Sequence, residues 1–421
     1  MLEKRKPISI EEAVSRVMAI NTAGSMETVS LQESLGRYLA EDITAAHDVP
    51  HFNRSPYDGF AIRSEDTSMA GNSHAVEFEV IEELGAGMVA EKRVGPFQAA
   101  RIMTGTQMPE GADTVIMLEL VREYEEQGRK FISVKRRQES GENVSFKGED
   151  AKEGESLLRK GTYINPGVIA VLATFGYHSV KVAKKPVIGL FATGTELLDV
   201  AEDLQPGKIR NSNAPMIAAQ AARAGAEAVY FGQLPDHLEV CYDAVKKALD
   251  KVDILITTGG VSVGDFDFMP EIYKRLEAEV LFNKVAMRPG SVTTVARLGN
   301  KILYGLSGNP SACYVGFELF VRGVIRTMLF SSSPYLRKEK AWLKEDFPKA
   351  NPFARLIRSR VMIEEGRLYA QPSGLDKSSV VMSLAGANAL IVLPGGTRGY
   401  KKEDEVEVFL LEDHEGSQWL K

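Results

Sequence analysis

The sequence predicts a multidomain protein in which a doubly wound α/β region is combined with β-rich regions. Strand-type and helix-type segments alternate from about residue 186 to residue 330. This rhythm is typical of a parallel sheet with helices on both faces. Residues from about 45 to 148 carry strand-type segments between turn signals, and short strand-type segments return after residue 331. The alternating region is therefore predicted to have a β-rich region on each side.

The length and composition are those of a large globular protein. The 421 residues are enough for about three domains, and 44% apolar with 26% charged residues is an ordinary globular balance. A net charge of -6 does not favour a nucleic-acid partner. The chain lacks a signal-peptide pattern and an apolar run of the roughly 20 residues that cross a bilayer. We therefore expect a cytoplasmic protein that has no membrane contact.

The cysteines and histidines offer no metal-binding spacing. Cys241 and Cys313 are too few for a disulfide framework, which suits a reducing compartment. Cys313 lies in an apolar helical segment, so we expect a core residue rather than a nucleophile. The six histidines are scattered along the chain.

Two capped helices are predicted outside the alternating region. Ser9 and Glu12 form a capping box ahead of an apolar stripe. Asn165 and Pro166 are typical of the cap and first residue of a second helix, which Gly176 ends.

Polar loops follow the four strands predicted in the alternating region, at residues 186–193, 226–232, 252–258 and 301–307. Ligands of open parallel sheets bind beyond the carboxyl ends of the strands. We therefore expect a binding site at this edge. The loop residues concerned are Glu196, Asp236, Gly259, Gly260, Asp265, Asp267, Ser307, Asn309 and Pro310.

Each of these loops also has a purely structural interpretation. Gly259 and Gly260 could expose amides to a phosphate, or could form a tight turn with Asp267 as N-cap. The loop by itself favours neither. Asn309 with Pro310 is ordinary cap-and-start chemistry, although such an N-terminus also attracts anions.

Charged residues gather around the same edge. Glu196, Asp236 and Asp267 together favour a site for a hard cation such as Mg²⁺. Lys284 and Arg288, four residues apart in a segment with proline and glycine, add positive charge nearby. Two such basic residues more often form a solvated face.

The β-rich region has three dense turn-like stretches. In "RSPYDGFAIR", Asp58 and Gly59 are a strong turn signal and are typical of a hairpin tip. "RIMTGTQMPEGAD" and "FKGEDA" are likewise small-residue turns with polar ends. The residues alone favour a structural interpretation of all three.

Taken together, seven stretches resemble the MoeA family, the molybdopterin molybdenumtransferases, to which the E domain of gephyrin is related. They keep the family's order and span nearly the whole chain. The stretches are "DVPHFNRSPYDGFAIR", "RIMTGTQMPEGADTVIM", "KGEDA", "GLFATGTEL", "KIRNSN", "TTGGVSVGDFDF" and "GLSGNPSA".

The resemblance implies the last step of molybdenum cofactor synthesis. Adenylylated molybdopterin would lose AMP by Mg²⁺-assisted hydrolysis and receive molybdate at its dithiolene. The resemblance also implies a homodimer of elongated subunits, whose active cleft lies between the doubly wound domain of one subunit and the "DGFA" domain of the other. A transient contact with the adenylylating enzyme would deliver the substrate.

Four domains per subunit are implied in the same way. An α+β connecting domain would comprise residues 27–44 and 149–180, and the β-rich "DGFA" domain residues 45–148. The doubly wound molybdopterin-binding domain would comprise residues 7–26 and 181–330. A small β-barrel-like domain would comprise residues 331–421.

The resemblance also assigns roles motif by motif. Catalytic roles fall to Asp58, Glu196, Asp236 and Asp267, and the last three of these are the implied metal ligands. Gly259 and Gly260 would hold the phosphate of molybdopterin, and Asp265 becomes a turn residue. Molybdate would be bound by Lys284, Arg288, Ser307, Arg355 and Ser378. The other implied substrate-binding positions are Thr104, Asp150, Thr193, Gly194, Ser262, Asn309 and Pro310.

Two departures from the family pattern concern the anion site. Ser291 stands where a lysine is usual, and Ser307 where proline is common. Loss of the lysine lowers the local positive charge, so we expect weaker molybdate binding or compensation by other groups. The pattern does not decide between molybdate and tungstate.

Two other functions fit parts of the sequence. One is a CinA-type nucleotide-processing enzyme built on the same doubly wound domain, and the other is a non-catalytic scaffold like gephyrin. The "RSPYDGFAIR" module and the β-rich tail argue against the first. The second lacks the support of a long linker or an appended domain.

Overall fold

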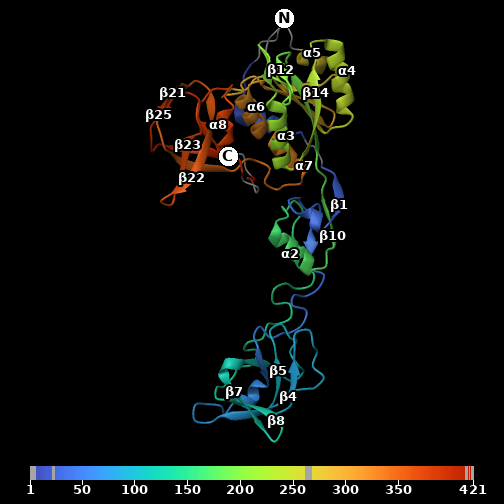
Figure 1. Cartoon of the computed structure of the whole chain (residues 1–421), viewed down its shortest axis with the longest axis vertical. Coiled ribbons are helices and arrows are strands. Elements are labelled where there is room, and N and C mark those ends of the chain that lie inside the picture. Colours follow the sequence, from blue (N-terminus) through green and yellow to red (C-terminus); the bar gives the residue numbers. More distant parts are fainter. Residues whose placement is uncertain (1–5, 21–23, 261–267, 413–415, 417, 419–421) are drawn as a thin grey trace. The chain divides into compact units, whose positions relative to one another are not determined.

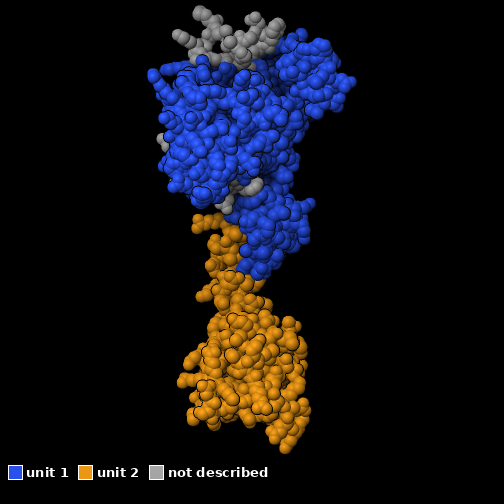
Figure 2. All heavy atoms as spheres, turned by 60° about the vertical axis from the view of Figure 1, so that its left-hand side comes forward, with its two compact units in different colours: residues 1–41, 160–421 blue, residues 42–159 orange. Residues whose placement is uncertain are grey.

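The computed structural model describes residues 6–20, 24–260, 268–412, 416 and 418. Figure 1 traces the chain, and Figure 2 colours its two compact units. One unit comprises residues 1–41 and 160–421, and the other comprises residues 42–159. Within the described residues, no helix is long and apolar enough to cross a membrane.

A six-stranded sheet forms the centre of the first unit. Its strand order is β14-β11-β15-β19-β18-β16. The first four strands are parallel and the last two are antiparallel. The parallel part confirms the predicted alternation, whereas the antiparallel extension was not predicted. The strands are β14 (Glu227–Leu234), β11 (Val187–Thr193), β15 (Ile254–Thr258), β19 (Lys301–Leu306), β18 (Thr294–Leu298) and β16 (Glu279–Phe282).

Helices cover both faces of this sheet, as a doubly wound fold requires. Ile254 and Ile256 belong to one core cluster and Leu255 between them to another, since neighbouring strand residues point to opposite faces. The first face packs against α1 (Ile10–Met18), α3 (Asn213–Ala224), α6 (Pro310–Gly316), a π-helical turn η4 (Phe317–Val321) and α7 (Arg322–Met328). The second face packs against α4 (Leu238–Leu249) and α5 (Met269–Arg275).

Both predicted helix caps are confirmed. The Ser9 side chain accepts a hydrogen bond from the Glu12 backbone N–H at 3.1 Å. Asn165 accepts from the Val168 N–H at 3.0 Å and precedes α2 (Pro166–Thr174). In sequence, α2 lies between the antiparallel partners β1 (Met26–Ser30) and β10 (Ser179–Ala183).

The C-terminal region of the first unit is a small closed barrel. β22 (Ala354–Glu364) pairs with both β23 (Arg367–Pro372) and β24 (Ala389–Leu393), and β20 (Lys338–Leu343) with β26 (Glu405–Leu410) completes the ring. The predicted all-β tail is thereby confirmed. The two-residue strand β17 (Met287–Arg288) adds to β22 in parallel. The remaining elements are β21 (Phe347–Asn351), β25 (Thr397–Tyr400), α8 (Met382–Ala385), β12 (Leu197–Leu198), β13 (Ile209–Arg210) and η1 (Gln32–Ser34).

The second unit is built on a curled six-stranded sheet of order β6-β3-β5-β4-β8-β7. Its β-rich character was predicted, but strands β3 and β5 were missed. The strands are β6 (Thr114–Met117), β3 (Gly59–Ile62), β5 (Gln98–Ile102), β4 (Val76–Leu84), β8 (Arg129–Val134) and β7 (Val121–Glu126). A short pair, β2 (Ile43–Thr44) with β9 (Ser156–Leu158), and the 3₁₀ turns η2 (Ser64–Thr67) and η3 (Leu118–Leu120) complete it.

The turn expected at Asp58 and Gly59 is wrong. Gly59 begins β3, which lies between β5 and β6. A Cβ atom at Gly59 would come 2.2 Å from the carbonyl oxygen of Ile116. Glycine is therefore required here because a neighbouring strand approaches closely, and not because a hairpin turns.

A buried carboxylate joins the sheet helices to the barrel. The Glu318 side chain is 1% exposed and lies in the π-helical turn. It accepts from Arg223 Nη2 at 2.5 Å and lies 3.2 Å from Arg322 Nη1. Arg322 Nη1 also donates to the carbonyl of Leu411, just after the last barrel strand, at 2.7 Å. Burial opposes the charge on Arg223, but Glu318 and Tyr314 outweigh it and raise the pKa of the guanidinium.

We expect Glu318→Gln to lower the free energy of unfolding by about 3 kcal/mol, because it leaves two arginines without their buried counter-charge. Glu339→Gln is the control, since Glu339 forms an exposed ion pair with Arg337 at 2.7 Å. The control should cost less than about 1 kcal/mol. Urea unfolding followed by circular dichroism measures both. Equal effects of the two substitutions would contradict this account.

Candidate functional site

The loops singled out in the sequence do share one edge of the sheet. In the parallel register, Thr193 is opposite Leu234, and Thr258 is opposite both Ala192 and Leu306. The four strands therefore end together, and the segments that follow them begin side by side. This geometric expectation is confirmed.

Gly259 and Gly260 lie against Thr193 of the neighbouring strand. Both glycines have positive φ, +86° and +63°. Thr193 Oγ1 donates to the Thr258 carbonyl at 3.1 Å, and the Gly259 N–H donates to the Leu306 carbonyl at 2.9 Å. A Cβ at Gly259 would stand 2.7 Å from Thr193 Oγ1. This turn requires glycine for its φ and for its packing.

Glu196 and Asp236 follow the adjacent strands β11 and β14. A Cβ at Gly194 would stand 2.5 Å from Glu196 Oε2, so the carboxylate of Glu196 lies close over this glycine. Asp236 lines a small cavity of about 20 Å³ with Thr193 and Gly260. That volume holds about one water molecule.

Only part of the predicted metal site lies within the described residues. Asp267 and Ser262 lie outside the described residues. Among the described residues, no group of three His, Cys, Asp or Glu side chains could hold a metal ion.

A polar cavity of about 370 Å³ brings together five predicted substrate-binding residues: Arg288, Ser307, Asn309, Arg355 and Ser378. These residues come from segments far apart in the sequence. The pairing of β17 with β22 sets Arg288 directly opposite Arg355. Two guanidinium groups on neighbouring strands repel one another unless an anion lies between or beside them.

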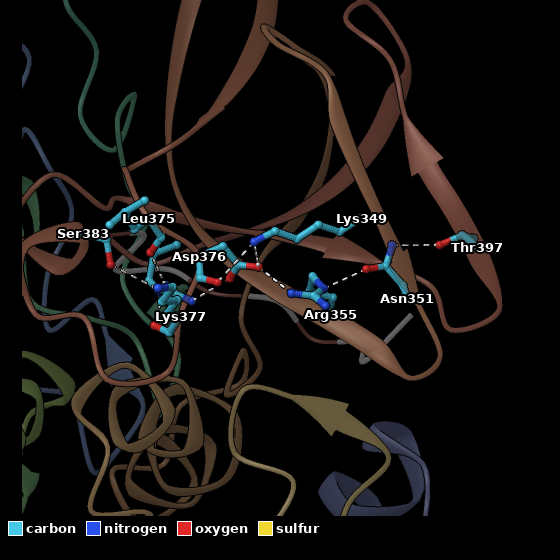
Figure 3. Close-up of polar contacts among 9 residues, drawn as sticks. Lys349, Asn351, Arg355, Leu375, Asp376, Lys377, Ser383 and Thr397 are labelled. Carbon is cyan, nitrogen blue, oxygen red and sulfur yellow. Dashed lines mark hydrogen bonds and ion pairs between the residues drawn. The ribbon is translucent and has the colours of Figure 1, made fainter.

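Arg355 is held in place by a chain of side chains (Figure 3). Its Nε donates to Asn351 Oδ1 at 2.7 Å, and Asn351 Nδ2 donates to Thr397 Oγ1 at 3.0 Å. Arg355 Nη1 lies 2.5 Å from Asp376 Oδ2. The guanidinium also lies over the ring of Phe347, 5.6 Å from its centroid. These contacts fix the orientation of Arg355 at the cavity wall.

The neighbouring loop is shaped by a second, buried arginine, Arg358. Arg358 has a side chain only 1% exposed and donates to the carbonyls of Leu375 and Lys377 at 3.1 and 3.2 Å. Burial lowers the pKa of this guanidinium, and Asp376 opposes that shift. The loop that carries Asp376 and Ser378 is thus built around Arg358.

The same loop is tied to the sheet domain. The Ser311 N–H donates to the Ser378 carbonyl at 3.0 Å, and the Ser311 hydroxyl donates to the Val380 carbonyl at 2.6 Å. Ser311 lies in the first turn of α6, next to Asn309 and Pro310. The barrel loop and the loop after β19 therefore form adjoining walls of the cavity.

Some predicted residues take other places. Lys284 and Pro310 are not among the described residues that line the cavity. The Lys284 carbonyl accepts from the Ile8 N–H at 3.2 Å, and Pro310 is the first residue of α6. Asn309 takes the predicted N-cap position, but within the described residues its side chain makes no capping bond.

In the second unit, Asp58 and Thr104 are direct partners. Asp58 Oδ1 accepts from the Thr104 N–H at 2.7 Å and from the Thr104 hydroxyl at 2.9 Å. These bonds lower the pKa of the Asp58 carboxyl. Asp150 is exposed, and its backbone N–H donates to the Val49 carbonyl at 3.0 Å. The polar residues that the resemblance implies in this unit are thus connected by hydrogen bonds to the segment of residues 49–58.

Several residues at or beside the cavity wall carry no signal in the sequence. Asp376 and Lys377 line the cavity beside the predicted Ser378. Asn351 orients Arg355 from another strand. Asp376 and Lys377 belong to the stretch "DKSS". No spacing rule identifies such loop residues, because they reach their partners only when the barrel closes.

Three family models match the chain and together cover most of it. They describe the MoeA N-terminal region (domain I and II) at residues 8–176, a probable molybdopterin binding domain at residues 189–327, and the MoeA C-terminal region (domain IV) at residues 340–411. The chain belongs to the MoeA family.

Curated relatives agree with this assignment along their full length. The molybdopterin molybdenumtransferase of Bacillus subtilis is 60% identical over 419 residues, which is 100% of this chain and 97% of the relative. That of Staphylococcus aureus (strain COL) is 50% identical over 420 residues, 100% of this chain and 99% of the relative.

A solved structure shows the same fold. The molybdopterin biosynthesis moeA protein of Pyrococcus horikoshii OT3 superposes with a TM-score of 0.83 at 33% identity, over 96% of this chain and 100% of the other. The four-domain MoeA layout is therefore this protein's fold. The residue boundaries expected for the four domains stay a prediction.

We expect Gly259→Ala to destabilise the protein more than Gly207→Ala. Both glycines have positive φ, but a Cβ at Gly207 would meet nothing within 4 Å. The control therefore costs only the backbone strain of about 1–2 kcal/mol, and Gly259→Ala adds roughly 1–3 kcal/mol for the collision with Thr193. Thermal unfolding midpoints measure the difference. Equal midpoints would show that Thr193 does not restrict this turn.

Proposed function

We propose that this protein inserts molybdate into adenylylated molybdopterin, with release of AMP, as a molybdopterin molybdenumtransferase of molybdenum cofactor biosynthesis. Family membership supports the pathway and the enzyme class. One structural observation supports the site. The cavity beside β17 and β22 gathers cations and hydroxyl groups of the kind that bind a small oxyanion.

The cavity suits a tetrahedral dianion for chemical reasons. Arg288 and Arg355 each offer a planar fork of N–H donors, which binds oxyanions in two-point fashion. Ser307 and Ser378 add neutral hydroxyl groups from the two adjoining walls. Donors of different orientation can thus bind the separate oxygens of one anion. Molybdate would stay bound in the cavity until the dithiolene displaces its oxygens.

The missing family lysine has a replacement in this chain. Ser291 lines the cavity where the family usually has the lysine, and Lys377 lines it from the barrel loop. We assign to Lys377 the positive charge that Ser291 does not supply. The choice between molybdate and tungstate would then depend on size and donor spacing, since both anions carry the same charge.

The AMP-releasing step belongs to the sheet edge in this proposal. The glycine turn at Gly259 and Gly260 would bind the molybdopterin phosphate through backbone N–H groups. Glu196, Asp236 and Asp267 are the proposed ligands of Mg²⁺, with Thr193, Gly194 and Ser262 beside the substrate. When bound, such a cation neutralises charge on the pyrophosphate.

The proposal includes a homodimer, as the family resemblance implies. Asp58, Thr104 and Asp150 would then act in the site of the partner subunit. The hydrogen bonds from Thr104 that lower the pKa of Asp58 favour its ionised form, which supports a role as an acceptor. We propose further that an adenylylating enzyme transfers the substrate to this protein, and that the reaction takes place in the cytoplasm.

Arg355→Gln should weaken molybdate binding about tenfold to a hundredfold, because a charge-assisted hydrogen bond to an anion contributes roughly 1.5–3 kcal/mol. Arg360→Gln is the matched control, since Arg360 lies on the same strand β22 and is exposed. Isothermal titration with molybdate measures both variants. An unchanged dissociation constant for Arg355→Gln would remove this cavity from the proposal.

Removal of divalent cations with EDTA should abolish AMP release from adenylylated molybdopterin, and Mg²⁺ should restore it. Asp267→Asn should reduce AMP release by about a hundredfold if Asp267 holds the cation, because mutation of even an outer-shell partner of a metal ligand typically costs roughly 10- to 100-fold. Asp265→Asn, two residues away in the same stretch, is the control and should retain activity. AMP measured by chromatography decides the result, and metal-independent release would contradict the magnesium part. A complete lack of AMP release would favour a scaffold over an enzyme.

A further inference from the structure

One carboxylate lies inside the cationic cavity, and the proposed reaction does not use it. Asp376 lines the cavity together with three cations, Arg288, Arg355 and Lys377. The Asp376 side chain is only 8% exposed, so water screens its charge poorly. A fixed negative charge at this place opposes the entry of a dianion.

The two oxygens of Asp376 have different partners (Figure 3). Oδ1 lies 3.2 Å from Nη1 of the buried Arg358. Oδ2 lies 2.5 Å from Nη1 of Arg355 and 3.7 Å from Nζ of Lys349. Oδ1 thus neutralises a structural arginine, whereas Oδ2 engages an arginine at the cavity wall.

In the part of the chain that the structure describes, neither Arg288 nor Lys377 takes part in an ion pair. Among these described cations of the cavity, Arg355 is the one that an internal carboxylate already holds. Its Nε is bound separately by Asn351, so the guanidinium stays anchored when the contact to Asp376 is broken.

We propose that Asp376 is an internal competitor of the oxyanion, which holds Arg355 in the free cavity and yields it to the incoming anion. The inference rests on the proposed function of the cavity as the molybdate site. An incoming oxygen replaces Oδ2 at Nη1, so one charge-assisted hydrogen bond replaces another. Asp376 thereby weakens oxyanion binding and keeps the anion free to leave for its acceptor.

The test is molybdate titration of full-length Asp376→Asn by calorimetry at fixed ionic strength. The asparagine has the same shape and keeps an oxygen that accepts from Arg358, but it carries no charge. We expect the dissociation constant for molybdate to fall about threefold to tenfold, because the dianion loses a close negative neighbour. Sulfate, a dianion of the same shape class, should gain by a similar factor.

Asp346→Asn is the matched control for charge alone. Asp346 belongs to the same barrel region, where its Oδ1 accepts from the Lys402 N–H at 2.7 Å. It does not line the cavity among the described residues. Its substitution changes the net charge of the chain equally, and we expect the molybdate dissociation constant to stay within about twofold of wild type because the exposed charge is screened.

A second variant covers the event that Asp376→Asn does not fold. Arg358→Met with Asp376→Asn removes both members of the buried Arg358–Asp376 pair, so the charge of Arg358 is not left unpaired in the interior. Thermal unfolding identifies the folded variants, and tighter molybdate binding is expected in each of them. Unchanged or weaker binding in a folded variant overturns the competitor role and leaves Asp376 as a residue that only positions Arg355. Absence of binding to the wild-type protein instead overturns the proposed function of the cavity.

Discussion

Two residues of backbone pairing connect the main parts of the candidate anion site. Met287 and Arg288 add to the barrel strand β22 opposite Ala354 and Arg355. The segment that follows the sheet strand β16 is thereby fixed to the C-terminal barrel. This pairing sets two arginines side by side, and the cavity forms around them. Without it, the two guanidinium groups would not be set opposite one another, where a common anion can contact both.

Buried carboxylates balance the charge that this arrangement concentrates. Glu318 neutralises Arg223 and Arg322 at the helices behind the sheet, and Asp376 serves Arg355 and Arg358 at the barrel. An arginine with a 1% exposed side chain is costly unless a counter-charge and carbonyl acceptors surround it. Such buried arginines occur in this protein where they hold segments that are distant in sequence together. Rigidity of the cavity wall follows from the same contacts.

Much of the fold was predictable because its signals are local. The caps at Ser9 and Asn165 need only residues within one helical turn. The parallel strands were recognised from apolar segments separated by helices. By contrast, β3 and β5 were missed because Gly59 looks like a turn residue, whereas a close backbone neighbour requires it. The π-helical turn and the antiparallel strands β16 and β18 carry no comparable local signal.

Arg288, Ser307 and Asn309 were singled out by their place near the sheet edge, whereas Arg355 and Ser378 came from family resemblance. Asp376, Lys377 and Asn351 came from neither pattern nor resemblance. Their role depends on long-range contacts, such as the bond from Arg355 on β22 to Asn351 on β21.

The sequence by itself determined the alternation of helices with parallel strands, the shared edge of those strands and the family. Each of these depends on short-range patterning or on motifs read in order. Only the tertiary structure decided which charges meet, because Arg288, Arg355 and Asp376 become neighbours through strand pairing and barrel closure. Charge interactions depend on distance and burial, and neither quantity is encoded at a single position.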